Sequence, residues 1–186
     1  MHSNKNRRRL MAAVDLDALV RVARDAEPMA PYAGFVLAVG RKWVLLARTS
    51  DGGHADGHIA FRLRDVTAVR WDTSFESRAA KMLPSWPRRA PVATETLDFD
   101  TTRGMLETLV APTQLMAIQF RDAAAGLRVG VMERVTSDHL VLREIAPDAS
   151  WDEESTRSRL GRLSVVEIGS LYLQSLAMVA GPPASP

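Results

Sequence analysis

The chain repeats one pattern of glycine and apolar residues, and this repeat limits its fold more than any other feature of the sequence. In each copy a glycine is followed five positions later by an apolar residue, and ten positions later a run of three apolar residues begins. The matched positions are Gly34, Val39 and Val44-Leu45-Leu46 in the first copy and Gly130, Val135 and Leu140-Val141-Leu142 in the second. Each copy then reaches a further glycine, in Gly57-His58-Ile59 and in Gly161-Arg162-Leu163. Self-similarity of this kind predicts two copies of one structural unit.

Apolar residues inside the copies recur at every second position, which is the period of a half-buried β-strand. The runs in the first copy are Phe35, Leu37 and Val39, alternating with Val36 and Ala38, and Ile59, Phe61 and Leu63, alternating with Ala60, Arg62 and Arg64. Glycine tolerates the crowding of a sharply bent strand because it has no Cβ. The repeat therefore predicts short, bent strands that close into small barrels, with Arg62 and Arg64 on the outer face.

A helix is predicted before each set of strands. Residues 16–23 have helical apolar spacing behind Asp15, and residues 106–110 have it behind the capping residues Asp100 and Thr101. A further short helix is expected after each set, because Thr73-Ser74-Phe75-Glu76 matches a capping box and residues 171–179 form an apolar counterpart. The repeated unit is thus predicted to combine a helix with a small barrel.

A proline-rich segment separates the copies. Three prolines lie in the run Pro84-Ser85-Trp86-Pro87-Arg88-Arg89-Ala90-Pro91. Proline has no backbone N–H to donate, so this run is unfavourable for both a helix and a sheet. Trp86 is expected to dock against one of the units. The predicted boundaries are a disordered basic tail at 1–11, a first unit at 12–83, a linker at 84–99, a second unit at 100–180 and a disordered tail at 181–186.

The order of these stretches resembles that of Sm-like proteins, which are bent five-stranded barrels. In the second copy the resemblance rests on Ile118-Gln119-Phe120-Arg121-Asp122 and on residues 130–142 and 161–171. The whole chain also resembles an uncharacterised bacterial family with no assigned activity, through Gly-Phe-Val-Leu-x-Val-Gly-x-x-Trp-Val-Leu-Leu at 34–46 and Arg-Leu-x-Asp-Val at 62–66. The resemblance implies a mainly β fold of two tandem units, each a helix plus a small bent Sm-like or SH3-like β-barrel, joined by the Pro-rich linker.

Sm-like proteins typically form rings and bind RNA. Their RNA pockets use an Asp-x-x-x-Asn arrangement and an Arg-Gly pair, and neither copy of this chain matches them. A fold without the site residues does not carry the function of its relatives.

Composition and charge narrow the class of protein. The chain has no cysteine, which excludes disulfides and thiolate metal sites and favours a reducing, cytoplasmic location. Asp15 and Asp17 end the apolar run that follows the basic N-terminus, so we expect neither an export signal nor a membrane segment. The net charge of +2 is smaller than the charge of the tail residues Lys5, Arg7, Arg8 and Arg9, so the remainder is nearly neutral; Met11 is an alternative native start.

His54, Asp56 and His58 are the one local group of potential metal ligands. In an extended strand the three side chains would share one face, and imidazole with carboxylate suits zinc. The segment follows Asp51-Gly52-Gly53 and contains Gly57, which favours a hairpin connection with solvated polar residues. We therefore expect no tight metal site, and no cofactor.

Arg62, Arg64 and Arg70 form a candidate basic stripe, and Trp71 is available to stack on bases. The competing interpretation is an ordinary charged surface beside a strand edge. Trp43, Trp71 and Trp151 are each expected to serve mainly in packing, because indole contributes a large apolar area.

The chain contains none of the common catalytic or phosphate-binding motifs, so we predict that it is not an enzyme. Two functions remain. The leading hypothesis is a non-catalytic assembly or protein-interaction module, whose exposed strand edges pair with another protein or another copy. The alternative is a single-stranded RNA or DNA binding protein.

Overall fold

The protein, described by a computed structural model, is mainly β, and the structure describes residues 2–25, 27–122 and 126–183. The first five strands are β1 (Leu19–Arg24), β2 (Glu27–Val39), β3 (Trp43–Thr49), β4 (Ala55–Arg62) and β5 (Val66–Trp71). The other strands are β6 (Leu115–Phe120), β7 (Leu127–Val135), β8 (His139–Ile145), β9 (Trp151–Arg159) and β10 (Leu163–Ile168). The helices are α1 (His2–Asp15), α2 (Phe75–Met82), α3 (Thr102–Leu109) and α4 (Leu171–Ala180).

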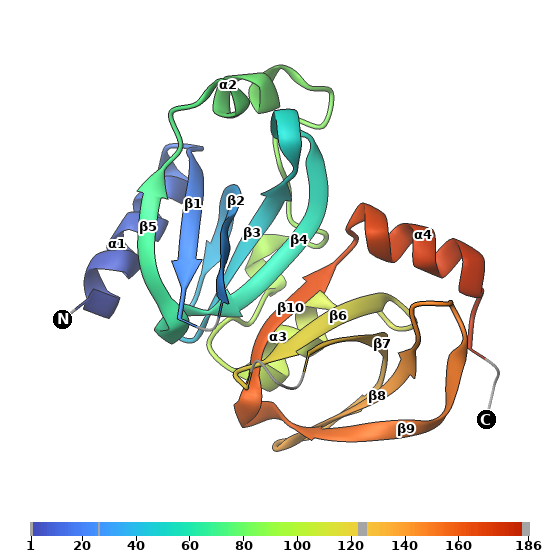
Figure 1. The fold of residues 1–186 in the computed structure, drawn as a ribbon. Coiled ribbons are helices and arrows are strands. Elements are labelled where there is room, and N and C mark those ends of the chain that lie inside the picture. Colours follow the sequence, from blue (N-terminus) through green and yellow to red (C-terminus); the bar gives the residue numbers. More distant parts are fainter. Residues whose placement is uncertain (1, 26, 123–125, 184–186) are drawn as a thin grey trace.

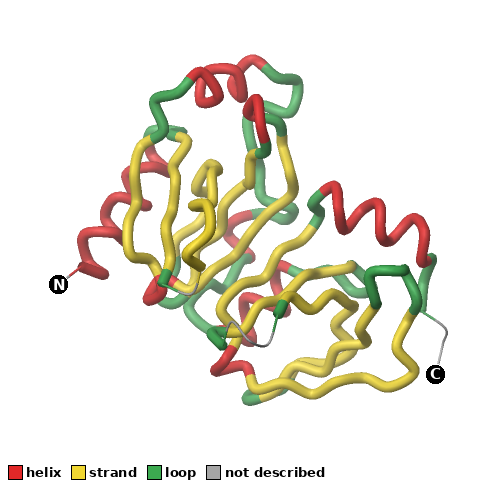
Figure 2. Tube along the Cα trace, viewed as in Figure 1, coloured by secondary structure: helices red, strands yellow, loops and turns green. Residues whose placement is uncertain are grey.

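All of these strands belong to one open sheet, in the order β5-β1-β2-β3-β4-β10-β6-β7-β8-β9 (Figure 1). Every pair of neighbours is antiparallel. The sequence predicts two small barrels, held together and joined by a Pro-rich linker. The described strands instead form one continuous sheet, whose halves each curl and are joined by direct pairing of β4 with β10 (Figure 2).

The second half of the sheet repeats the strand order and register of the first. The order β5-β1-β2-β3-β4 is followed by the equivalent order β10-β6-β7-β8-β9. Gly34 faces Arg48, and Gly130 faces Glu144. A 3-10 turn directly precedes β5 and another directly precedes β10, at Leu63–Asp65 and at Leu160–Arg162. The repeated spacing in the sequence thus corresponds to repeated register in the sheet.

Two of the repeated glycines lie where neighbouring strands approach too closely for any side chain. A Cβ on Gly34 would be 2.4 Å from the carbonyl oxygen of Ala47, and a Cβ on Gly130 would be 2.1 Å from that of Arg143. Both distances are far below van der Waals contact. Glycine is therefore required at these points by the bending of β2 and β7.

The largest apolar core extends across both halves. Trp43 and Leu45 of β3 pack in one cluster with Leu106 of α3, Ile118 of β6 and Val166 of β10. A second cluster joins residues of the first half to Val165 of β10, and a third packs α4 onto β6 and β7. Because the main core is shared, the halves support each other through burial as well as through hydrogen bonds.

The N-terminal helix was misplaced by the sequence pattern. We expected a helix at residues 16–23 and a disordered tail at 1–11. Residues 19–24 instead form β1, which pairs with β2 on one side and β5 on the other, and the helix is α1. Leu10 and Ala13 are buried against the first half of the sheet, and this contact orders the basic segment.

The other three helices are where the sequence predicts them. The hydroxyl oxygen of Thr101 accepts a hydrogen bond from the backbone N–H of Gly104 at 2.9 Å, so it caps α3 as expected. The capping box before α2 is not formed: Ser74, the residue before the helix, makes no side-chain capping hydrogen bond, and its hydroxyl donates to Asp72. Among the described residues no helix has both the length and the apolar character needed to span a membrane.

The predicted connecting and terminal segments have mixed outcomes. In the 84–99 segment Trp86 packs edge-on against Phe35 of β2, with ring centroids 4.9 Å apart. Phe99 is buried, and its carbonyl oxygen accepts hydrogen bonds from the backbone of Lys42 and Trp43. Residues 181–183 lie beyond α4 without regular structure, and residues 184–186 and Met1 lie outside the described residues.

Candidate functional site

The candidate site lies where the two halves of the sheet meet. Along this junction Phe61 of β4 faces Val165 of β10, and Ala60 faces Val166. All four side chains are buried. The apolar pairs fix the position of the polar groups at the end of the junction, because closely packed side chains have few alternative rotamers.

Arg62, the last residue of β4, is the central polar group of the junction. Its Nε donates to the carbonyl oxygen of Leu163 at 2.9 Å, and its Nη2 donates to that of Leu160 at 3.0 Å. The guanidinium lies over the ring of Trp43, 4.6 Å from its centroid. Burial lowers the pKa of Arg62 to about 10, with a smaller contribution from the positive charges of Arg64 and Arg121. Arg62 therefore holds a charge at the junction at some energetic cost.

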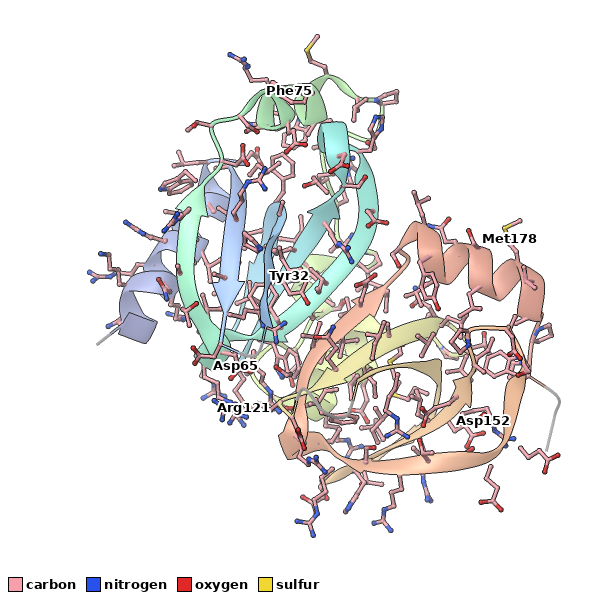
Figure 3. All side chains as sticks on the ribbon, in the orientation of Figure 1. Tyr32, Asp65, Phe75, Arg121, Asp152 and Met178 are labelled. Carbon is pink, nitrogen blue, oxygen red and sulfur yellow. The ribbon has the colours of Figure 1, made fainter. Side chains whose placement is uncertain are left out.

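A second polar chain crosses the junction through Ser164 of β10. Arg24 Nη2 donates to Ser164 Oγ at 2.8 Å, and Ser164 Oγ donates to Asp65 Oδ2 at 2.9 Å. Arg121 Nε, from the second half, lies 3.3 Å from Asp65 Oδ1. Figure 3 shows Asp65 and Arg121 close together where the halves meet. These contacts join side chains of the first half to side chains of the second. They help to hold the two halves in one orientation, because charge-assisted hydrogen bonds are strong and directional.

An open cavity of about 720 Å³ adjoins Arg62. It is bounded by the N-terminus of α3, the loop between β7 and β8, and the 3-10 turn at Leu160–Arg162. Its charged and ionisable lining residues are Lys42, Arg62, Arg103, Asp138, His139, Arg159 and Arg162. Five of these are Lys or Arg and one is a carboxylate, so the cavity is strongly basic.

The basic residues of the cavity differ in whether their charge is already balanced. Arg103 pairs with Glu107 at 2.8 Å, and Arg162 with Asp122 at 3.5 Å. Within the described part of the chain, no carboxylate forms an ion pair with Lys42, Arg62 or Arg159. The cavity therefore carries unbalanced positive charge near the junction.

This arrangement is suited to binding anions. Guanidinium and ammonium groups donate strongly to phosphate and carboxylate oxygens, and the N-terminus of a helix adds a favourable dipole. Comparisons of the chain with protein-family models, with curated proteins and with solved structures found no match.

The residues proposed for nucleic-acid binding do not form one stripe. Arg62 is buried, with 6% of its surface exposed, so the prediction that it faces outward was wrong. Arg64 is exposed beside the junction, where its Nη2 donates to the carbonyl oxygen of Gly161 at 3.4 Å. Arg70 and Trp71 are exposed at the other end of β5. The alternation of apolar and polar residues placed Arg62 on the outer face, but the side chain is buried because that face meets the other half of the sheet.

The potential metal ligands are held apart by other partners. His58 Nε2 lies 2.8 Å from the carbonyl oxygen of Arg89, and Asp56 accepts a hydrogen bond from the backbone N–H of Leu171. Asp56 also pairs with Arg48 at 3.5 Å. Across the described residues, no group of three or more His, Cys, Asp or Glu side chains is placed to hold a metal ion.

Sequence reasoning missed most of the cavity. Lys42, Arg103 and the neighbouring pair Arg159 and Arg162 come from three separate segments, which only the fold brings together. One signal was present in the repeat, because Arg62 and Arg159 each directly precede the 3-10 turn of their half. Aligning the copies through that turn would have paired these two arginines.

Proposed function

We propose that this chain is a non-catalytic assembly module, built from two copies of an Sm-like small-barrel unit, whose molecules join end to end. The observation that supports the proposal is the junction of β4 with β10. In sheet order, β10 and β5 are the first strands of their halves, and β4 and β9 are the last. The junction inside one molecule therefore joins the same two kinds of strand that lie at its free ends. A second copy could place its β5 against β9 in the same way.

Arg159 of β9 occupies the position that Arg62 has on β4. Arg62 faces Trp43, the first residue of β3, and Arg159 faces His139, the first residue of β8. Each arginine is followed at once by a 3-10 turn. Arg159 is exposed, and no described carboxylate pairs with it. It is thus available to a second copy.

The carbonyl groups that Arg62 uses also have counterparts on β5. Leu160 and Leu163 begin and follow the 3-10 turn of the second half, and Leu63 and Val66 do so in the first half. An incoming β5 would present the Leu63 and Val66 carbonyl oxygens to Arg159. Since this contact joins two different surfaces, repeated copies would form a ring or an open chain.

Cysteine cross-linking tests the proposed contact, and the absence of natural cysteine keeps the result clear. Ile59 faces Glu167 across the internal junction, and their counterparts at the free ends are Thr156 and Arg70. Mixing Thr156→Cys and Arg70→Cys chains under mild oxidation should give disulfide-linked dimers, because directly opposed residues have closely spaced Cβ atoms.

The matched control replaces Thr156→Cys by Arg134→Cys, an exposed position on β7 away from both free edges. Adding Arg159→Glu to the Thr156→Cys chain should reduce cross-linking strongly, whereas adding Arg134→Glu should not. Equal cross-linking in the test and control mixtures would rule out the end-to-end contact.

A second candidate function is favoured by a separate observation, the unbalanced positive charge of the junction cavity. We infer that this cavity binds phosphate groups of single-stranded RNA or DNA. Lys42 lines the cavity and pairs with no carboxylate among the described residues, and Arg103 adds a charge that a phosphate could share with Glu107. Each phosphate contact would release counterions, so the affinity would fall with rising salt concentration.

Fluorescence anisotropy with a random single-stranded RNA and a random single-stranded DNA tests this function. Lys42→Glu with Arg103→Glu should weaken binding and reduce the salt slope by about one unit per lost phosphate contact. The control double variant is Arg78→Glu with Arg134→Glu, which makes the same charge change at exposed positions outside the cavity. Unchanged affinity and slope in the cavity variant would exclude the site.

A further inference from the structure

Helix α1 reaches the backbone of β5 through two polar side chains. Asn6 Nδ2 donates to the carbonyl oxygens of Val66 and Thr67, at 3.0 and 3.2 Å, and Arg9 Nη1 donates to that of Val69 at 3.0 Å. Asn6 is buried, with 5% of its surface exposed. In Figure 1 α1 lies beside β5, at the end of the sheet.

The register of β5 shows that Val69 points its backbone groups away from the sheet. Asp72 N donates to the carbonyl oxygen of Leu19, and Val20 faces Trp71 between them. Val20 and Trp71 are therefore a pair without direct hydrogen bonds, and such pairs alternate with bonded ones along an antiparallel ladder. Val69 is two residues from Trp71 and belongs to the same class. Its carbonyl oxygen, which Arg9 holds, thus lies on the free edge.

Asn6 holds a carbonyl group that a second copy would need. Val66 directly follows the 3-10 turn of the first half, as Leu163 follows that of the second. Leu163 receives Arg62 Nε at the internal junction, and Val66 receives Asn6 Nδ2. In the end-to-end contact proposed above, the donor to Val66 would be Arg159 of the second copy. Asn6 therefore occupies the place of that arginine.

We propose that α1 covers the β5 edge and competes with β9 of a second copy for it, so that release of α1 controls assembly. This inference rests on the proposed end-to-end contact. The helix is anchored by Leu10 and Ala13 in the core, which favours the covered state. A helix laid on a strand edge is one of the ways by which proteins prevent unwanted pairing. Here the covering helix belongs to the same chain, so α1 can leave the β5 edge without the dissociation of another molecule.

Sedimentation velocity of the full chain over a range of concentrations tests the competition. Arg9 is exposed, and Arg9→Ala removes the hydrogen bond to the Val69 carbonyl oxygen. Asn6→Ala removes the hydrogen bonds to the Val66 and Thr67 carbonyl oxygens. Each should raise the self-association constant by about tenfold, because the incoming strand then displaces fewer hydrogen bonds. Arg8→Ala, an exposed arginine on the same helix, is the matched control and should behave as the parent chain.

The outcomes separate this inference from the proposed function. Circular dichroism first establishes that each variant is folded. If Asn6→Ala does not fold, Arg9→Ala alone still decides the test. If Thr156→Cys and Arg70→Cys chains cross-link but folded Arg9→Ala associates no more tightly than Arg8→Ala, the role of α1 is excluded and the contact stands. If no variant associates and no cross-link forms, the end-to-end contact itself is wrong, and the inference about α1 falls with it.

Discussion

Arg62 Nε on β4 donates to the carbonyl oxygen of Leu163 on β10 at 2.9 Å, and this bond joins residues from opposite halves of the sheet. The same guanidinium also holds the carbonyl oxygen of Leu160. A single side chain thus satisfies two backbone acceptors at the mouth of the basic cavity. The position of Arg62 makes it a structural residue of the junction, although its charge also faces the cavity.

Replacing Arg62 should therefore destabilise the fold. Arg62→Ala removes the hydrogen bonds to the Leu160 and Leu163 carbonyl oxygens and the contact with Trp43, so we expect a loss of about 2–4 kcal/mol in the free energy of unfolding. Arg64→Ala, at an exposed neighbouring position, should change it by less than about 0.5 kcal/mol. Urea titrations of both variants measure the difference. Equal stability of the two would mean that Arg62 does not hold the junction.

The repeated glycines should be intolerant of any side chain. Gly34→Ala and Gly130→Ala each place a Cβ against a backbone carbonyl oxygen that cannot easily move, and we expect each to cost about 1–3 kcal/mol. Gly161→Ala is the control, because a Cβ there would meet nothing within 4 Å. Thermal melting of the three variants should show two lowered midpoints and one unchanged or slightly raised. A midpoint for Gly130→Ala equal to that of Gly161→Ala would contradict the crowding argument.

The packing of α1 predicts that the N-terminal segment contributes to stability. Leu10 is fully buried, so Leu10→Ala should leave a cavity and lower the free energy of unfolding by about 2–5 kcal/mol. Met11 is the neighbouring residue with 44% of its surface exposed, and Met11→Ala should have little effect. Chemical denaturation distinguishes the two. If Leu10→Ala is as stable as the parent, the helix is not packed in solution.

His58 predicts a loss of stability in mildly acidic solution. Burial lowers the pKa of His58 below its usual value, and the hydrogen bond to the Arg89 carbonyl only partly opposes this. The unfolded chain then binds the proton more readily, so stability is full above about pH 6.5 and falls as the pH drops below that value. Urea unfolding of the parent and His58→Gln between pH 5 and 8 measures the effect. The variant should lose this part of the pH dependence.

Local patterns predicted a large part of the fold correctly. The period of two and the glycine spacing identified strands that became β2, β4, β7 and β8, because strand formation follows from short-range alternation. The capping threonine of α3 was also identified, since a cap depends on residues three positions apart. The apolar residues at 16–23 fit the helical period as well as the period of a strand, which is why the local pattern predicts a helix there. Pairing with β2 and β5 decided in favour of a strand.

By itself, the sequence determined that the chain would be mainly β, with one spacing used twice, because alternation and glycine positions are properties of neighbouring residues. Only the tertiary structure decided that β4 would pair with β10, that Arg62 would be buried, and that α1 would lie on the β5 edge. These features join residues roughly 60 to 100 positions apart. Their stability comes from desolvation and from hydrogen bonds across the junction, and neither quantity is encoded in any local pattern.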